Sequence, residues 1–113
     1  MPKNFLIYLE DIIEAINRIE KYVNNLSYIS FSENNLVIDA VIRNLEIIGE
    51  ASKNIPSEIK EKYPNIEWKK IIGLRDILIH AYSGVNLEIL WDIIINKIPK
   101  LKILIKRIIK DLS

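Results

Sequence analysis

The sequence predicts an all-α protein, an up-and-down bundle of four to five helices in one domain spanning residues 1–113. Apolar residues recur at alternating steps of four and three, which is the period of amphipathic helices in a bundle. No segment alternates apolar and polar residues between turns as a half-buried strand does. No repeat or low-complexity segment interrupts the chain, and 113 residues suffice for one domain with a core.

The first helix is predicted from one seam of seven apolar residues near the N-terminal end. These residues are Phe5, Leu9, Ile12, Ile16, Ile19, Val23 and Leu26. The pattern breaks at Asn24-Asn25 and at Ser30-Phe31-Ser32. Because serine is a favoured N-cap, Ser32 is predicted to begin a second helix that runs to about Asn54.

Prolines delimit a short third helix. Pro56-Ser57-Glu58 opens it, and it ends before Pro64, because the residue before a proline is pushed out of the helical region. The next helix is expected from Glu67 to about Ala81. Ser83-Gly84 is its predicted stop.

The last helical segment begins with Asn86 as its N-cap. Its apolar residues are Leu87, Trp91, Ile94, Ile98, Leu101, Ile105, Ile108 and Leu112. This pattern crosses Pro99 without losing phase, and a proline inside a helix removes one hydrogen bond and kinks it. We therefore expect one long bent helix or two nearly collinear helices. Trp68 and Trp91 fall on apolar faces, so they are expected in the core rather than as platforms for stacking bases.

Composition excludes several classes of protein. Charged residues break every apolar run before the roughly 20 residues that a membrane span requires, so we expect a soluble protein that does not bind membranes. The N-terminal residues lack the pattern of a signal peptide, which predicts a cytoplasmic location. With no cysteine and one histidine, the chain has no disulfide, no thiolate zinc site and no multi-imidazole metal site of its own. We expect chemistry without a metal or a cofactor.

The C-terminal end is basic although the net charge is only +1. After residue 96 the single acidic residue is Asp111, and the basic residues are Lys97, Lys100, Lys102, Lys106, Arg107 and Lys110. Such a run could steer RNA or an acidic partner. More often it is the solvated face of a helix, which is the interpretation we favour.

The segment from Arg75 to Tyr82 places the single histidine, His80, five residues after an arginine within an otherwise apolar run. Arginine offers a cationic fork for phosphate, and histidine titrates near neutral pH. On an ideal helix Arg75 and Tyr82 nearly share one line, whereas Arg75 and His80 lie about 140° apart. Arg75 and His80 could converge on one phosphate only if the helix loosens near its end or a second copy of the chain completes the site.

Asp76 forms an i,i+4 pair with His80 on the same helix. Its carboxylate can accept a hydrogen bond from one imidazole nitrogen, and the nearby helix C-terminus also favours the protonated ring. Such a histidine is a competent general acid. In the alternative, His80 merely ends the helix and Arg75 makes a surface ion pair. Spacing alone supports both interpretations equally.

These residues carry a resemblance to the HepT-like branch of the HEPN superfamily. It rests on Arg75-x4-His80-x-Tyr82, on Trp68 and Gly73 before it, on Gly84-Val85 and Trp91 after it, and on Arg43–Ala51 and Ile98-Pro99-x-Leu101. Similar proteins are toxins of type II or VII toxin–antitoxin systems, paired with a minimal nucleotidyltransferase antitoxin. The resemblance implies a two-fold dimer whose Arg-x4-His motifs face a shared cleft and cleave RNA without metal.

The resemblance also implies a role for each residue of the motif. His80 acts as general acid or base, Arg75 holds the phosphate, and Asp76 orients His80. Relatives often carry asparagine where Asp76 stands, and the added negative charge is expected to weaken RNA binding. A dimer supplies two histidines and two arginines where one chain supplies one of each.

Tyr82 resembles the tyrosine that the nucleotidyltransferase modifies with AMP in members of this branch. The AMP group would add bulk and negative charge where the RNA phosphate must lie. In the alternative, Tyr82 packs against the bundle or stacks on a base. Ser83 stands where relatives commonly carry an aromatic residue.

Arg43, Glu46 and Glu50 lie within about 60° of arc on the predicted second helix. They either support the cleft or, as we favour, form an ion-pair stripe that buttresses the motif helix. Gly49 beside them allows another helix to approach closely. Gly73 costs about 1 kcal/mol relative to alanine in a helix, so we expect a close backbone approach there, at the dimer interface.

A second function is compatible with the same residues. In this alternative the chain is a non-catalytic helical module that binds nucleic acid or nucleotide, or a partner subunit of the nucleotidyltransferase. The intact pair Arg75 and His80 favours the nuclease. A bare dimerisation bundle would require the motif to be a coincidence.

Overall fold

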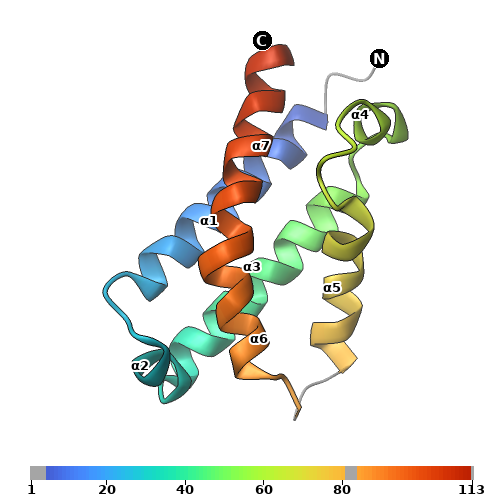
Figure 1. The fold of residues 1–113 in the computed structure, drawn as a ribbon. Coiled ribbons are helices and arrows are strands. Elements are labelled where there is room, and N and C mark those ends of the chain that lie inside the picture. Colours follow the sequence, from blue (N-terminus) through green and yellow to red (C-terminus); the bar gives the residue numbers. More distant parts are fainter. Residues whose placement is uncertain (1–4, 81–83, 113) are drawn as a thin grey trace.

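The computed structural model describes residues 5–80 and 84–112, and every regular element within these ranges is a helix. This confirms the predicted all-α class. The long elements are α1 (Leu6–Val23), α3 (Asn35–Lys53), α5 (Trp68–His80) and a continuous stretch formed by α6 (Leu87–Asp92), the π-helix η2 (Ile93–Lys97) and α7 (Ile98–Leu112). The short helices are α2 (Tyr28–Ser32) and α4 (Ser57–Lys62), at opposite ends of α3 (Figure 1).

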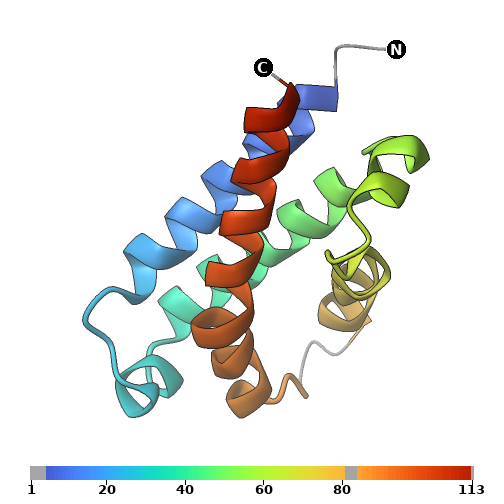
Figure 2. The same ribbon diagram turned by 45° about the horizontal axis from the view of Figure 1, so that its top comes forward.

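Helix α3 is the central element of the bundle. It makes the most extensive contacts of the fold with α1, and the next most extensive with α5. Figure 1 and the rotated view in Figure 2 both place α1 and α5 on opposite sides of α3, with α7 lying across α1. The candidate motif therefore sits on a helix whose main support is α3.

The predicted apolar seams form the core. On α1 the seam residues Leu9, Ile12, Ile16 and Ile19 are fully buried, and on α7 Ile105 and Ile108 are as well. Both tryptophans pack as expected. Trp68 is buried and donates its indole N–H to the carbonyl of Tyr63, and Trp91 is half-buried, with its ring 5.0 Å from that of Phe31.

The prediction that Ser32 caps the second helix is wrong. Ser27 caps the unpredicted α2 and Asn34 caps α3, each through a side-chain oxygen that accepts the backbone N–H three residues later. Ser32 ends α2, and its hydroxyl donates to the carbonyl of Ile29. The fully buried Phe31 explains the extra turn of helix, because its ring is drawn into the core against α6.

The other helices lie close to their predicted positions, but α1 is shorter than its predicted apolar seam. Helix α1 stops at Val23, before the seam residue Leu26, because Asn25 adopts a left-handed conformation with φ of 66°. Helix α5 begins one residue after the predicted Glu67. Ser83, the first residue of its predicted stop, lies outside the described residues.

Pro99 is accommodated by a wider turn of helix. The π-helical segment η2 ends two residues before this proline and joins α6 to α7 without a break. A proline ring clashes with the carbonyl four residues earlier in a regular α-helix, and a π-turn relieves such a conflict. Ile94 and Ile98 are both buried, so the apolar seam keeps its phase across the bend, as predicted.

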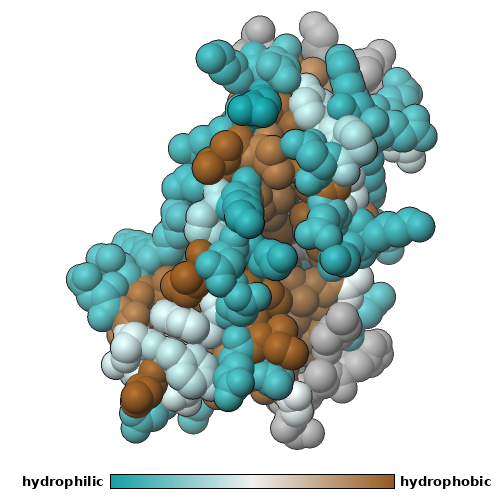
Figure 3. Space-filling view, viewed as in Figure 1, coloured by the Kyte–Doolittle hydropathy of each residue, from teal (hydrophilic) through white to brown (hydrophobic). Residues whose placement is uncertain are grey.

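None of the helices in the described part of the chain is long and apolar enough to span a membrane. Figure 3 shows polar side chains around the rim of one face. Polar side chains also lie down its middle, and apolar side chains show between them beside α7, on the side that faces α5.

Candidate functional site

Gly49 sets the distance between the motif helix and α3. A Cβ atom on Gly49 would lie 3.1 Å from the carbonyl oxygen of Ile71 and 3.2 Å from the Cβ atom of Arg75, which is tighter than ordinary van der Waals contact. Only glycine allows this approach without a shift of the neighbouring backbone. The close approach expected at Gly49 is therefore present, and Arg75 stands directly opposite it.

Arg75 is held by an ion pair that joins α5 to α3. Its Nε atom lies 2.8 Å from the Oε2 atom of Glu50, and the side chains of Arg75 and Glu50 are 40% and 54% exposed. Pairs this exposed contribute at most about 1 kcal/mol to stability. The pair therefore matters for the position of Arg75 rather than for stability, because it restrains a guanidinium group that still faces solvent.

Among the described side chains, the other two residues of the predicted stripe form no ion pair with α5. Arg43 pairs with Glu46 within α3 at 3.6 Å, and the Arg43 side chain is 70% exposed. Glu50 is therefore the member of the stripe that reaches Arg75. The adjacent pair Gly49-Glu50 was the sequence signal for this contact, because it places a carboxylate one residue after a point of close helix packing.

A groove of about 380 Å³ opens beside Arg75. Its lining comes from α1, α3 and α5 and consists of Tyr8, Asp11, Arg43, Glu46, Ile47, Glu50, Ala51, Asn54 and Arg75. Three carboxylates face two guanidinium groups here, so the groove is less suited to a phosphate than the exposed side of Arg75. Among the described residues, no group of three or more histidine, aspartate or glutamate side chains is arranged to hold a metal ion.

The remaining motif residues are only partly described. Asp76 is exposed on α5 beside Arg75. The backbone of α5 is helical through His80, so positions 75 and 80 lie about 140° apart around its axis. The side chain of His80 and all of Tyr82 lie outside the described residues. The expected pairing of Asp76 with His80 thus stays a prediction.

Gly73 has no close neighbour in the described chain. Nothing lies within 4 Å of the position that a Cβ atom would occupy there. The expected close approach is therefore not made by the described residues of the same chain. Its placement at a dimer interface stays a prediction.

The start of α5 carries a second ion pair. Glu67 and Lys70 are 2.7 Å apart. The hydrogen bond and charge of Lys70 lower the pKa of Glu67, with a smaller contribution from Lys97, and Glu67 in turn raises the pKa of Lys70. Both side chains lie at the surface, so this pair tethers the first turn of α5 rather than forming part of the site.

The basic residues of α7 point mainly to solvent. Lys102 is an exception, because it bonds to Glu20 of α1 at 2.7 Å. Lys100, Lys106 and Arg107 are exposed on the face opposite the buried seam. This arrangement agrees with the favoured interpretation of a solvated helix face.

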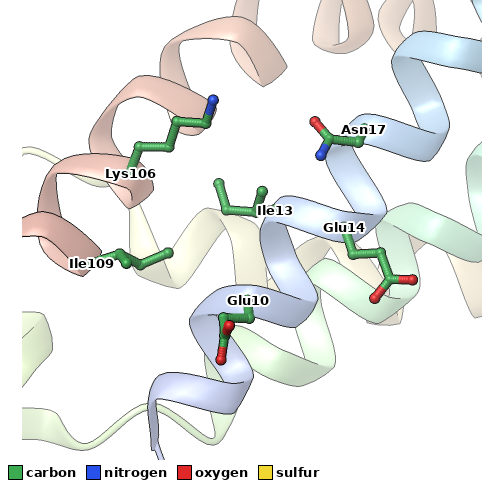
Figure 4. Close-up of a pocket in the computed structure, with 6 residues that line it drawn as sticks. All are labelled: Glu10, Ile13, Glu14, Asn17, Lys106 and Ile109. Atoms are coloured by element: carbon green, nitrogen blue, oxygen red, sulfur yellow. The ribbon is translucent and has the colours of Figure 1, made fainter. Parts of the chain in front are cut away.

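A second groove, of about 460 Å³, lies between α1 and α7 (Figure 4). Lys106 and Ile109 reach from α7 toward Ile13 of α1, whereas the carboxyl group of Glu14 points away from Lys106. None of its lining residues belongs to the motif. The exposed side of Arg75, at the edge of the 380 Å³ groove, is therefore the candidate functional site.

Comparison with known proteins places this geometry in context. Residues 12–108 match the family described as Ribonuclease HepT-like. A protein of Methanocaldococcus jannaschii named "Putative RNase MJ0127" is 45% identical over 114 residues, covering 100% of this chain and 94% of the relative. A protein of Thermococcus cleftensis named "Probable ribonuclease HepT" is 46% identical over 102 residues, covering 90% of this chain and 93% of the relative.

The chain also matches part of a longer protein. It spans 51% of a Methanocaldococcus jannaschii protein named "Gamma-glutamylcyclotransferase and putative RNase MJ0434", with 46% identity over 113 residues. No solved structure matches the chain significantly.

Proposed function

Because the chain belongs to the Ribonuclease HepT-like family, we propose that it is an endoribonuclease that cleaves RNA without metal, by acid–base catalysis, in a cleft formed by two subunits. The observation that carries this proposal is the position of Arg75. Its guanidinium group is restrained by Glu50 yet open to solvent, five residues before the single histidine of the chain. A restrained, accessible arginine near a histidine is suited to phosphodiester chemistry.

The proposed reaction uses the RNA as its own nucleophile. A base removes the proton of the 2′-hydroxyl, and the 2′-oxygen attacks the adjacent phosphorus. The bond to the 5′-oxygen breaks, and an acid protonates that oxygen, leaving a 2′,3′-cyclic phosphate and a 5′-hydroxyl. His80 transfers protons, Asp76 orients His80, and Arg75 stabilises the negative charge that develops on the phosphate.

The geometry of α5 supports a site built from two chains. Since the helix does not loosen before His80, the two motif positions of one chain point about 140° apart. The reaction also needs both an acid and a base, and each chain has a single histidine. A two-fold homodimer brings the Arg75 of one chain toward the His80 of the other and supplies the second imidazole.

We further propose that the chain is the toxin of a toxin–antitoxin pair in the cytoplasm. The partner is a minimal nucleotidyltransferase that transfers AMP to the hydroxyl of Tyr82. The bulky, charged AMP group, two residues after His80, would repel the RNA phosphate. Mass spectrometry of the chain co-expressed with such a partner tests this step, and the expected result is one adenylyl group on a peptide that contains Tyr82.

Cleavage of end-labelled RNA in the presence of EDTA tests the proposed function. The wild-type chain is expected to leave 2′,3′-cyclic phosphate ends, whereas the Arg75→Ala and His80→Ala variants should lose at least about a hundredfold in rate. Equal cleavage by the wild type and both variants would indicate a contaminating nuclease. RNA binding without cleavage by the unmodified wild type would instead support the non-catalytic binding module.

A further inference from the structure

We propose that Glu50 is a positioning residue that holds Arg75 by its Nε edge and leaves the two terminal amino groups of the guanidinium for an RNA phosphate. This inference rests on the proposed ribonuclease function and names the residue that prepares its phosphate-binding group. It is carried by the ion pair between Glu50 and Arg75 and by the close helix packing at Gly49.

The atoms involved determine which edge of Arg75 remains available. A guanidinium group can bind a phosphate through Nε and one terminal nitrogen, or through both terminal nitrogens. The Glu50 Oε2 atom lies 2.8 Å from the Arg75 Nε atom, so the first edge is occupied. A phosphate therefore binds end-on, through the two terminal nitrogens.

The packing around Gly49 explains why Glu50 is suited to this task. Gly49 brings the backbone of α3 into contact with Ile71 and Arg75 of α5, and Glu50 follows it on a regular helix. The carboxylate thus originates one residue after a point where the two helices pack closely. The other carboxylate on α3 that lines the groove, Glu46, pairs with Arg43 instead.

Holding Arg75 in place before RNA binds reduces the conformational entropy that its side chain loses on binding. A free arginine side chain has many accessible rotamers, and part of this conformational entropy is lost when it binds a ligand. The pair with Glu50 restrains the side chain before RNA arrives, so less is lost in the transition state. The carboxylate also repels the phosphate, but the 40% and 54% exposure of the two side chains allows water to screen this repulsion.

The test compares two arginine–glutamate ion pairs of similar exposure, one between helices and one within a helix. Glu50→Ala removes the carboxylate beside Arg75. Glu14→Ala removes the carboxylate of the pair between Glu14 and Arg18 on α1, whose side chains have similar exposures of 61% and 47%. Glu50→Gln is the conservative variant, because its amide oxygen is uncharged but able to accept a hydrogen bond from Nε.

In RNA cleavage, Glu50→Ala is expected to lower kcat/KM by about ten- to a hundredfold, the usual effect of losing an orienting partner. Glu50→Gln should recover part of this loss, and Glu14→Ala should match the wild type. All variants should unfold at nearly the same urea concentration, which separates positioning from stability. Activity of Glu50→Ala equal to or above that of Glu14→Ala overturns the inference, provided that Arg75→Ala is inactive in the same assay.

A second measurement distinguishes the proposed role of Glu50 from the proposed ribonuclease function. Nitrogen-15 NMR of the arginine side chains follows exchange of the Arg75 Nε proton without any need for catalysis. Slow exchange is expected in the wild type and in its complex with a 2′-deoxy-substituted RNA, and fast exchange in Glu50→Ala. Fast exchange in the wild type overturns the role of Glu50 whatever the activity, whereas a wild type that exchanges slowly but does not cleave RNA overturns only the nuclease.

Discussion

Two glycines on neighbouring helices have opposite surroundings. The Cβ position of Gly49 is crowded by the backbone of α5, whereas that of Gly73 is open within the described chain. In both helices alanine has a higher intrinsic propensity than glycine, by about 1 kcal/mol. The contacts around each glycine therefore decide whether its substitution by alanine stabilises or destabilises the fold.

Gly49→Ala is expected to destabilise the fold by roughly 1–3 kcal/mol, as other overpacked substitutions do. The new methyl group would meet the carbonyl oxygen of Ile71, which is backbone and cannot rotate away. Displacing α5 would also move Arg75 from Glu50, so RNA cleavage should fall as well. Urea unfolding measures the first effect, and the cleavage assay in EDTA measures the second.

Gly73→Ala is the matched control for this substitution. It should stabilise the separated chain by up to about 1 kcal/mol, because nothing described opposes the methyl group. A separated chain made less stable by Gly73→Ala would contradict the open surroundings of this residue. If Gly73 lies in a dimer interface as predicted, the same variant weakens the dimer, which sedimentation at several concentrations detects.

At the scale of elements, the loop before α5 is tied to the end of α7. The hydroxyl of Tyr63 donates a 2.8 Å hydrogen bond to the carboxylate of Asp111, and the Tyr63 carbonyl accepts the indole N–H of Trp68. Tyr63 thus links the first turn of the motif helix to a helix with which α5 shares few other contacts. This link fixes the end of α5 that lies farthest from His80.

Stability is expected to depend on pH through this link. The hydrogen bond to Asp111, then burial and then the charge of Asp111 raise the pKa of Tyr63 above its ordinary value of 10.0. A raised pKa means that the folded chain holds the proton more tightly than the unfolded chain does. The contribution of Tyr63 is therefore full below about pH 10 and is lost as the pH rises through the folded-state pKa.

Tyr63→Phe isolates this contribution from those of the other tyrosines. Near neutral pH the variant should be less stable than the wild type. Above pH 10 the difference between the two should shrink, because the wild type loses its proton and its hydrogen bond. Thermal unfolding across this range measures both, and a difference that stays constant with pH would contradict the assignment.

At the scale of the whole molecule, the proposed chemistry exceeds what one chain supplies. The chain carries one histidine, and the regular α5 directs positions 75 and 80 to different sides. A second copy related by a two-fold axis supplies a second histidine and can bring its own His80 near the Arg75 of the first chain. The composite site can be tested without knowledge of the dimer interface.

Subunit mixing provides that test. Wild-type chains are mixed with an equal amount of the Arg75→Ala/His80→Ala double variant and allowed to exchange subunits. Random exchange leaves about a quarter of the dimers fully wild type and makes about half of them mixed, and a mixed dimer has its one arginine and its one histidine on the same chain. If the site is built from both chains, the mixture should therefore show about a quarter of the activity of the same total concentration of wild-type dimers. Activity of about half after proven exchange would mean that each chain uses its own Arg75 and His80.

Most of the fold could be read from the sequence because helix formation is governed by local spacing. The three-and-four period of apolar residues located α1 and the α6–α7 stretch, and cap and stop signals located α3 and α5 to within a few residues. The comparisons confirm the family that the Arg75-x4-His80 order resembles. The cap at Ser32 was misplaced because Ser27, Ser32 and Asn34 are all good caps, and the burial of Phe31 selected among them.

The sequence by itself determined the helical class, the seams that form the core, the composition without cysteine and the motif on one helix. Only the tertiary structure decided that Glu50, rather than Glu46 or Arg43, reaches Arg75, and that Gly49 but not Gly73 is crowded. It also decided that a π-turn absorbs Pro99. The physical reason is that a helical period is a property of neighbouring residues, whereas a contact between helices depends on how their axes cross, which no single segment encodes.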